Sequence, residues 1–305
     1  MNYQNILDEI YSEINLIFQK GKVANYIPAL AKADVNDFAM SLITLDGKEY
    51  HIGCSEKKFS IQSISKVFTF ILALKNYGVQ LYERVGHEPS GNSFNSLVQL
   101  EYENGIPRNP FINAGAIVIT DTLMSIYKEN TTTTILDFLK KVSNCTDIDF
   151  DEEIYKSELE HGFRNIALIN MMKSFKNIRN NTDDVIQAYF KQCSIMMNTR
   201  QLARSGLFLA NHGINPLTKE EIVNTNKAKR INSVMLTCGH YDSSGDFAYK
   251  VGIPAKSGVG GGVLAVVPKK MALCVYAPGL NDKGNSLIGS KALELFTSKT
   301  GLSIF

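Results

Sequence analysis

The sequence predicts an α+β protein, in which an antiparallel sheet is flanked by helices and a large helical lobe is inserted. Three observations predict this class. Two apolar stretches flank Asp46-Gly47, which is a strong hairpin signal. Helical periodicity dominates the middle of the chain, and short strand-like segments return after Tyr241. The first and last segments can therefore complete one sheet, with the helical region as a second lobe.

This reasoning divides the chain into two lobes. We expect residues 1–66 and 214–305 to form a discontinuous sheet lobe, and residues 67–213 to form the helical lobe. Ligand sites favour the cleft between two such units, so we expect the active site there.

The N-terminal segment, from Ile6 to about Gln19, has helical spacing of its apolar residues, and Gly21 closes it. The hairpin strands are expected at residues 38–45 and 48–52.

The central region is expected to hold a series of helices separated by loops rich in Gly, Pro and Asn. For the last of them Asn198 or Thr199 is a plausible N-cap, but Leu202 stands where a capping box from Thr199 needs Glu or Gln. The expected helices are residues 67–75, 114–127, 134–142, 164–175, 182–192 and 199–209.

After Tyr241 the pattern changes again. Short strands are expected at residues 247–251, 262–268 and 271–276, and a final helix at 286–298.

Composition excludes several classes of function. The chain has 305 residues, 44% of them apolar, and a formal net charge of +2. Its Lys and Arg residues are scattered, which is typical of a solvated surface and argues against a nucleic-acid partner. No apolar stretch approaches the roughly 20 residues that cross a bilayer, so no membrane partner is expected.

The cysteines and histidines point to a reduced protein without a metal. The five cysteines show no paired spacing and are expected to be reduced and mostly buried. The five histidines are spread out, so we expect neither metal nor cofactor. Residues 1–10 form a polar amphipathic pattern without a basic start, unlike a signal peptide, and we expect a cytoplasmic protein.

The most informative stretch is Ser63-Ile64-Ser65-Lys66, between the hairpin and an apolar helix. Residues three apart share a helix face, so the Ser63 hydroxyl can lie beside the Lys66 amine. Apolar neighbours can desolvate the lysine and lower its pKa, and N–H groups at a helix start can bind developing negative charge. Two further copies of this spacing lie in charged surface segments and are expected to be solvated: Ser55/Lys58 and Ser125/Lys128.

A second candidate element is Lys256-Ser257-Gly258, just before a strand. On an edge strand, such a triplet supplies a cation, a hydroxyl and a close backbone approach. Lys299-Thr300-Gly301 has the same form, but Gly301 is expected to be the C-cap of the last helix.

Further polar residues have both a functional and a structural interpretation. Asn113 is expected to cap the helix that follows it; the alternative is that its amide faces the cleft. Residues 157–165 are expected to be a loop-to-helix junction, where Glu158 is ordinarily a surface acid and Asn165 structural. A tyrosine placed like Tyr26 is more often a packing residue than a catalytic one.

Taken in order, these segments resemble the serine-dependent glutaminase family, within the broader β-lactamase and penicillin-binding superfamily. The resemblance implies a β-lactamase-like fold and hydrolysis of L-glutamine to L-glutamate and ammonia. It is carried by these segments: Tyr26-Ile27-Pro28, Ser63-Ile64-Ser65-Lys66, Glu88-Pro89-Ser90-Gly91, Asn109-Pro110-Phe111-Ile112-Asn113-Ala114-Gly115-Ala116, Gly162-Phe163-Arg164-Asn165, Gly239-His240-Tyr241-Asp242 and Pro254-Ala255-Lys256-Ser257-Gly258-Val259.

The resemblance also implies catalytic roles. Ser63 would be the nucleophile and Lys66 the base that takes its proton. The backbone N–H groups of Ser63 and Val259 would stabilise the oxyanion. Tyr26 and Tyr241 would line the reacting centre, and one of them would help to protonate departing ammonia. The resemblance does not decide which of the two tyrosines does so.

Substrate binding is implied in the same way. Asn113, Glu158, Asn165 and Tyr189 would bind the amino-acid end of glutamine, with Glu158 paired to the α-ammonium group. Ser63, Tyr241 and Val259 complete the implied contacts. The family is usually oligomeric, which implies a dimer or tetramer.

Two other functions stay open on the sequence. A penicillin-recognising enzyme of the same superfamily normally acts outside the cytoplasm, and the implied amino-acid-binding set disfavours it. A binding protein that has lost the chemistry is a different class, and the intact Ser63 and Lys66 argue against it.

Overall fold

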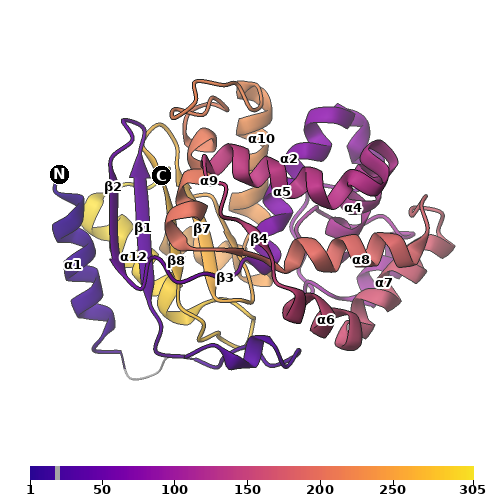
Figure 1. The fold of residues 1–305 in the computed structure, drawn as a ribbon, viewed down its shortest axis with the longest axis horizontal. Coiled ribbons are helices and arrows are strands. Elements are labelled where there is room, and N and C mark those ends of the chain that lie inside the picture. Colours follow the sequence, from indigo (N-terminus) through magenta and orange to yellow (C-terminus); the bar gives the residue numbers. More distant parts are fainter. Residues whose placement is uncertain (18–20) are drawn as a thin grey trace.

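The computed structural model describes residues 1–17 and 21–305. A five-stranded antiparallel sheet in the order β2-β1-β8-β7-β6 lies at one end of the molecule (Figure 1). The N-terminal hairpin and the C-terminal strands meet where β1 pairs with β8, with Ala39 opposite Tyr276. The strands are β1 (Ala39–Thr44), β2 (Glu49–Gly53), β6 (Ala255–Ser257), β7 (Gly262–Val267) and β8 (Met271–Tyr276).

Helices cover both faces of this sheet. α1 (Tyr3–Ile14) and α12 (Leu287–Thr300) pack together on one face, and α9 (Thr199–Ala210) packs on the other, against β1, β7 and β8. Met40 and Leu42 of β1 therefore belong to one hydrophobic core, and the alternate Ala39 and Ile43 to another.

The remaining helices gather beside the sheet (Figure 1). Two of them form the centre: α2 (Ser65–Tyr77), buried from Ser65 to Leu74, and α4 (Asn113–Tyr127), buried from Asn113 to Leu123. Around them lie α3 (Leu97–Tyr102), α5 (Thr131–Ser143), α6 (Glu152–His161), α7 (Phe163–Ser174), α8 (Thr182–Cys193) and α10 (Thr225–Cys238). α11 (Ser244–Lys250) contacts α10, and its buried Phe247 belongs to the same hydrophobic core as α1 and α12.

A small second sheet, in the order β3-β5-β4, joins the segment before α2 to the helical region. Its strands are β3 (Phe59–Ser60), β4 (Asp149–Phe150) and β5 (Ile195–Met197).

Most of the expected elements are confirmed. The hairpin, the six central helices, the strands at β7 and β8 and the final helix lie within a few residues of their expected positions. Gly301 is the left-handed C-cap of α12, with φ of 67°. Asn198 caps α9 and forms a capping box with Gln201, one position before the box that was considered from Thr199. α1 ends at Ile14, earlier than expected, and the expected end at Gln19 lies outside the described residues.

Three expectations for the later chain are wrong. The expected strand at 247–251 is the C-terminal half of α11 and the residue after it, because Phe247 and Val251 are buried four residues apart on one helical face. The expected junction at 157–165 instead holds the end of α6, which Asp151 caps and Gly162 terminates. α10 was not expected, although Asn224 caps it and its buried residues follow helical spacing.

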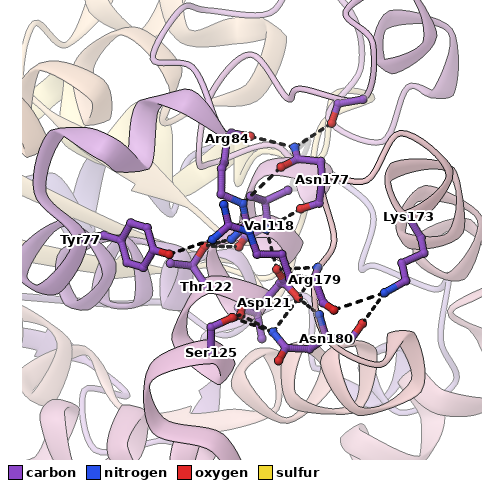
Figure 2. A network of polar contacts seen from close by, with 12 residues as sticks. Tyr77, Arg84, Val118, Asp121, Thr122, Ser125, Lys173, Asn177, Arg179 and Asn180 are labelled. Carbon is purple, nitrogen blue, oxygen red and sulfur yellow. Dashed lines mark hydrogen bonds and ion pairs between the residues drawn. The ribbon is translucent and has the colours of Figure 1, made fainter.

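A buried ion pair ties α4 to the chain that surrounds it. The Arg84 guanidinium contacts the Asp121 carboxylate, and their side chains are 5% and 0% exposed. Figure 2 shows how Asn177 and Asn180 complete the cluster: Asn177 accepts from Arg84, and the Asn180 backbone and side-chain N–H groups donate to Asp121.

We expect Asp121→Ala to lower the free energy of unfolding by about 3–5 kcal/mol, because the substitution leaves the Arg84 charge buried and unpaired. Urea unfolding followed by circular dichroism measures the change. Glu153→Ala is the matched control, since its ion pair with Lys32 has both side chains 64% exposed and is worth at most about 1 kcal/mol. Equal losses in the two variants would contradict the assignment.

Candidate active site

An enclosed cavity of about 280 Å³ lies between the segment that precedes α2 and the helices α4, α6, α7 and α8. This volume is just below the roughly 300–1,000 Å³ of most small-molecule sites, and it suits a molecule of amino-acid size. Seven of the nine residues singled out by the sequence line it: Tyr26, Ser63, Asn113, Glu158, Asn165, Tyr189 and Val259. Lys66 and Tyr241 are buried behind its wall, 0% and 4% exposed.

Ser63 and Lys66 lie on consecutive turns of helix. Ser63 is in a short 3-10 turn, Gln62–Ile64, that runs directly into α2, where Lys66 is the second residue. The Lys66 amine donates to Asn113 Oδ1 (2.6 Å) and to the Phe111 carbonyl (3.3 Å). Burial lowers the pKa of Lys66 to about 8. An appreciable fraction of this lysine is therefore neutral near neutral pH.

Asn113 does not cap its helix, contrary to expectation. Ile112 is the N-cap of α4, and Asn113 is its first residue. The Asn113 side chain links two other polar residues instead: its Oδ1 accepts from Lys66, and its Nδ2 donates to Asn165 Oδ1 at 2.9 Å. The alternative, an amide that faces the cleft, is what the structure has.

Glu158 supplies the carboxylate of the cavity. It lies in α6, is 2% exposed, and accepts a hydrogen bond from the Tyr26 hydroxyl at 2.6 Å. It is therefore neither a surface acid nor a loop residue. Burial raises the pKa of Glu158, while the hydrogen bond from Tyr26 and the charge of Lys66 oppose that rise. Desolvation of the Tyr26 hydroxyl and the neighbouring Glu158 raise the pKa of Tyr26 well above its ordinary value, although the residue as a whole is 47% exposed.

Two buried tyrosines complete the surroundings of Lys66 and Ser63. Tyr189 of α8 is 2% exposed, and the Lys66 Nζ lies 5.9 Å from its ring centroid. The Tyr241 hydroxyl donates to the Ser257 carbonyl at 3.4 Å, and burial raises the pKa of Tyr241 to about 12. The Ser63 and Ser257 groups near the Tyr241 hydroxyl oppose that rise.

The loop after the edge strand β6 approaches the Ser63 turn very closely. A Cβ atom on Gly258 would lie 2.6 Å from the Ile61 carbonyl oxygen and 3.4 Å from the Ser63 nitrogen. Only glycine allows this approach without a shift of the chain. Val259, the next residue, lines the cavity as a result.

The structure adds residues that the sequence reasoning missed. Gln62 has φ of 46°, unusual for a residue other than glycine, and among the described residues its amide nitrogen has no hydrogen-bond partner. Its position next to Ser63 was the only available signal. The other additions to the lining are Phe94, Asn95, His161, Gly162, Arg164 and Cys193.

Within residues 1–17 and 21–305, no group of three or more His, Cys, Asp or Glu side chains could hold a metal ion. No helix among these residues is long and apolar enough to span a membrane. All five cysteines are free, and three of them are buried.

Comparison with known proteins identifies relatives along the whole chain. A sequence profile of the glutaminase family matches residues 21–305. The chain is 71% identical to a glutaminase of Aliarcobacter butzleri over 305 residues, 100% of both proteins. It is 51% identical to a glutaminase of Rhizobium etli over 301 residues, 98% of this chain and 97% of that protein.

Solved structures agree with these relatives. A probable glutaminase, ybaS, superposes with a TM-score of 0.94 at 35% identity, over 99% of this chain and 97% of that one. A Bacillus subtilis probable glutaminase in complex with 6-diazo-5-oxo-L-norleucine superposes with a TM-score of 0.87 at 31% identity, over 99% and 95% of the two chains.

A mixed helix and antiparallel-sheet fold around a cavity with several convergent polar side chains, next to a buried lysine of lowered pKa, defines an enzyme that acts on a small polar molecule. The comparisons specify which one: the chain belongs to the glutaminase family, whose members are amidohydrolases.

Proposed function

We propose that this protein hydrolyses L-glutamine to L-glutamate and ammonia through a covalent acyl-serine intermediate at Ser63. The observation that carries the reaction is family membership along the whole chain, with 71% identity to a glutaminase. The covalent route is supported by a serine at the cavity and a buried lysine of lowered pKa one helical turn away.

In this proposal Lys66 is the general base. A neutral amine has two N–H groups and one lone pair, and Asn113 Oδ1 and the Phe111 carbonyl accept from Lys66. The lone pair is then free to take the Ser63 proton while Oγ forms a bond to the side-chain carbonyl carbon of glutamine.

The oxyanion would lie between two backbone segments. We assign its stabilisation to the N–H groups of Ser63 and Val259. The contact between Gly258 and the Ser63 turn supports this assignment, because it brings the two segments together.

Ammonia departs when a proton reaches the amide nitrogen and the C–N bond breaks. The Tyr26 hydroxyl donates a hydrogen bond to Glu158 at 2.6 Å, so the proton of Tyr26 is already engaged by that carboxylate. The Tyr241 hydroxyl donates a long hydrogen bond to Ser257, at 3.4 Å, and Ser63 is among the groups that lower its pKa, so we assign the proton relay to Tyr241. Water then cleaves the acyl-serine, with Lys66 again as the base.

The amino-acid end of glutamine would bind to the carboxylate and the amide side chains that line the cavity. Glu158 pairs with the α-ammonium group, while Asn113, Asn165 and Tyr189 satisfy the α-carboxylate. The Asn113–Asn165 hydrogen bond and the burial of Glu158 support this placement.

We also propose the finer features that the resemblance implies. The fold is β-lactamase-like, with the two lobes at residues 1–66 with 214–305 and at 67–213, and the protein is a cytoplasmic homo-oligomer. The sheet at one end of the molecule and the helices gathered beside it support the division, although α9 packs on the sheet.

The reaction is tested by ammonia release from L-glutamine, measured on the purified protein and on Ser63→Ala. We expect the variant to lose at least roughly 10⁴-fold in kcat while it stays folded, because it loses only the attacking hydroxyl. L-Asparagine and a chromogenic β-lactam are the alternative substrates. Glutamine binding without ammonia release would favour the binding-protein alternative, and β-lactam turnover the penicillin-recognising one.

Glu158→Gln tests the ammonium site. The change preserves shape and removes charge, so we expect KM for glutamine to rise roughly 10- to 100-fold, the equivalent of a charged hydrogen bond. Glu160→Gln is the control, because Glu160 lies on the same helix and is exposed. A KM that matches that control would remove Glu158 from the binding site.

The pH dependence of kcat/KM tests the base. Lys66 acts only when it is neutral, and its pKa is about 8, so kcat/KM should rise tenfold per pH unit below 8 and level off above it. At pH 7 it should be about a tenth of the plateau. Thermal stability is measured at each pH to exclude unfolding. A flat profile between pH 6 and 8 would contradict a lysine base.

A further inference from the structure

Tyr241 has a backbone conformation that needs support. Its φ is 55°, in the left-handed region that non-glycine residues rarely occupy. A bulky residue stays in this region only when its surroundings hold it there. The neighbours of the turn at residues 239–241 therefore decide where the Tyr241 ring points.

One side of the turn is held by the edge strand β6. The Gly239 carbonyl accepts from Lys256 Nζ and from the Ser257 backbone nitrogen, both at 3.1 Å. A Cβ atom on Gly239 would lie 1.7 Å from the Ala255 carbonyl oxygen, so the turn is in direct contact with the strand.

The other side is held by Asn285, which lies on the loop before α12 and is 2% exposed. Its Oδ1 accepts from the Ser257 hydroxyl at 2.7 Å, and its Nδ2 donates to the His240 carbonyl at 3.4 Å. The Ser257 carbonyl in turn accepts from the Tyr241 hydroxyl. Asn285 therefore joins the residue that precedes Tyr241 to the residue that its hydroxyl contacts.

The turn has room to move if this bridge is lost. A cavity of about 260 Å³, separate from the candidate active site, lies behind it and is lined by His240, Asn285 and Phe247 among others. His240 stacks on Phe247 there, with ring centroids 3.6 Å apart. A smaller side chain at position 285 enlarges this space and removes both hydrogen bonds, so the turn can relax away from Ser63.

We propose that Asn285 is a positioning residue, which holds the Tyr241 hydroxyl at the reacting centre by bridging His240 and Ser257. The inference rests on the proposed proton relay through Tyr241. Asn285 acts through Tyr241 and does not touch the substrate.

The experiment is a double-mutant cycle on the full chain, with Tyr241→Phe, Asn285→Ala and the double variant assayed for ammonia release. We expect Asn285→Ala to change KM less than twofold and to lower kcat roughly 10- to 100-fold, because a displacement of the Tyr241 hydroxyl by about 1 Å has an effect of that size. In the Tyr241→Phe background the same change should lower kcat less than twofold, because the hydroxyl to be positioned is already absent.

Asn232→Ala is the matched control, since it also removes an amide donor to a backbone carbonyl, that of Leu209, at 3.0 Å. It should leave kcat unchanged. Should Asn285→Ala fail to fold, Ser257→Ala removes the hydroxyl that contacts Asn285 at 2.7 Å and the Gly239 carbonyl of the same turn at 3.3 Å, and it should show the same non-additivity with Tyr241→Phe.

The outcomes separate the two proposals. An unchanged kcat in folded Asn285→Ala would overturn the role of Asn285, and so would an equal loss of kcat in the wild-type and Tyr241→Phe backgrounds. The proton relay would still stand in either case, provided that Tyr241→Phe itself is impaired. Full activity of Tyr241→Phe would overturn the relay itself, and the positioning role with it.

Discussion

The structure around the candidate site depends on the complete burial of the Lys66 amine. Water is excluded because α2 is covered on all sides from Ser65 to Leu74, and this desolvation lowers the lysine pKa to about 8. A buried amine without partners would destabilise the fold, and the start of α4 removes that cost through Asn113 and the Phe111 carbonyl. One packing arrangement thus makes the buried lysine tolerable and keeps part of it neutral, in the form that can accept a proton.

The second constraint is the close approach of backbone segments at the edge of the sheet. Glycine at 258 lets the loop after β6 contact the Ser63 turn, and glycine at 239 lets the Tyr241 turn contact the same strand. Backbone donors and a buried hydroxyl are thereby brought to the serine from a sheet whose strands come from both ends of the chain. The proposed oxyanion site and proton relay share one rigid support, because both are attached to β6.

Local patterns allowed much of the fold to be predicted, and long-range contacts account for what was missed. Asp46-Gly47 and the helical periodicities lie within short windows, so the hairpin and six helices could be predicted. Asn113 looked like a cap because its partner, Lys66, is 47 residues away. Glu158 looked like a surface acid because only the tertiary fold places Tyr26, 132 residues earlier, against it. The conformation of Gln62 has no local signature at all, since glutamine seldom adopts a positive φ.

Under the proposed function, the single carboxylate among the described residues that line the cavity, Glu158, decides how glutamine is oriented. Glu158 lies in α6 and accepts from Tyr26, whereas Ser63 lies in the 3-10 turn that runs into α2, where Lys66 is buried. Under the proposed function, the α-ammonium group is attracted to Glu158 and the side-chain amide reaches Ser63. The reverse orientation would bring a carboxylate to Glu158, which is disfavoured by charge repulsion in a dry cavity. Because Glu158 belongs to α6 and Ser63 to the turn before α2, the length of the substrate side chain would then decide whether the amide reaches the serine, so the same two groups would select substrate orientation and substrate length.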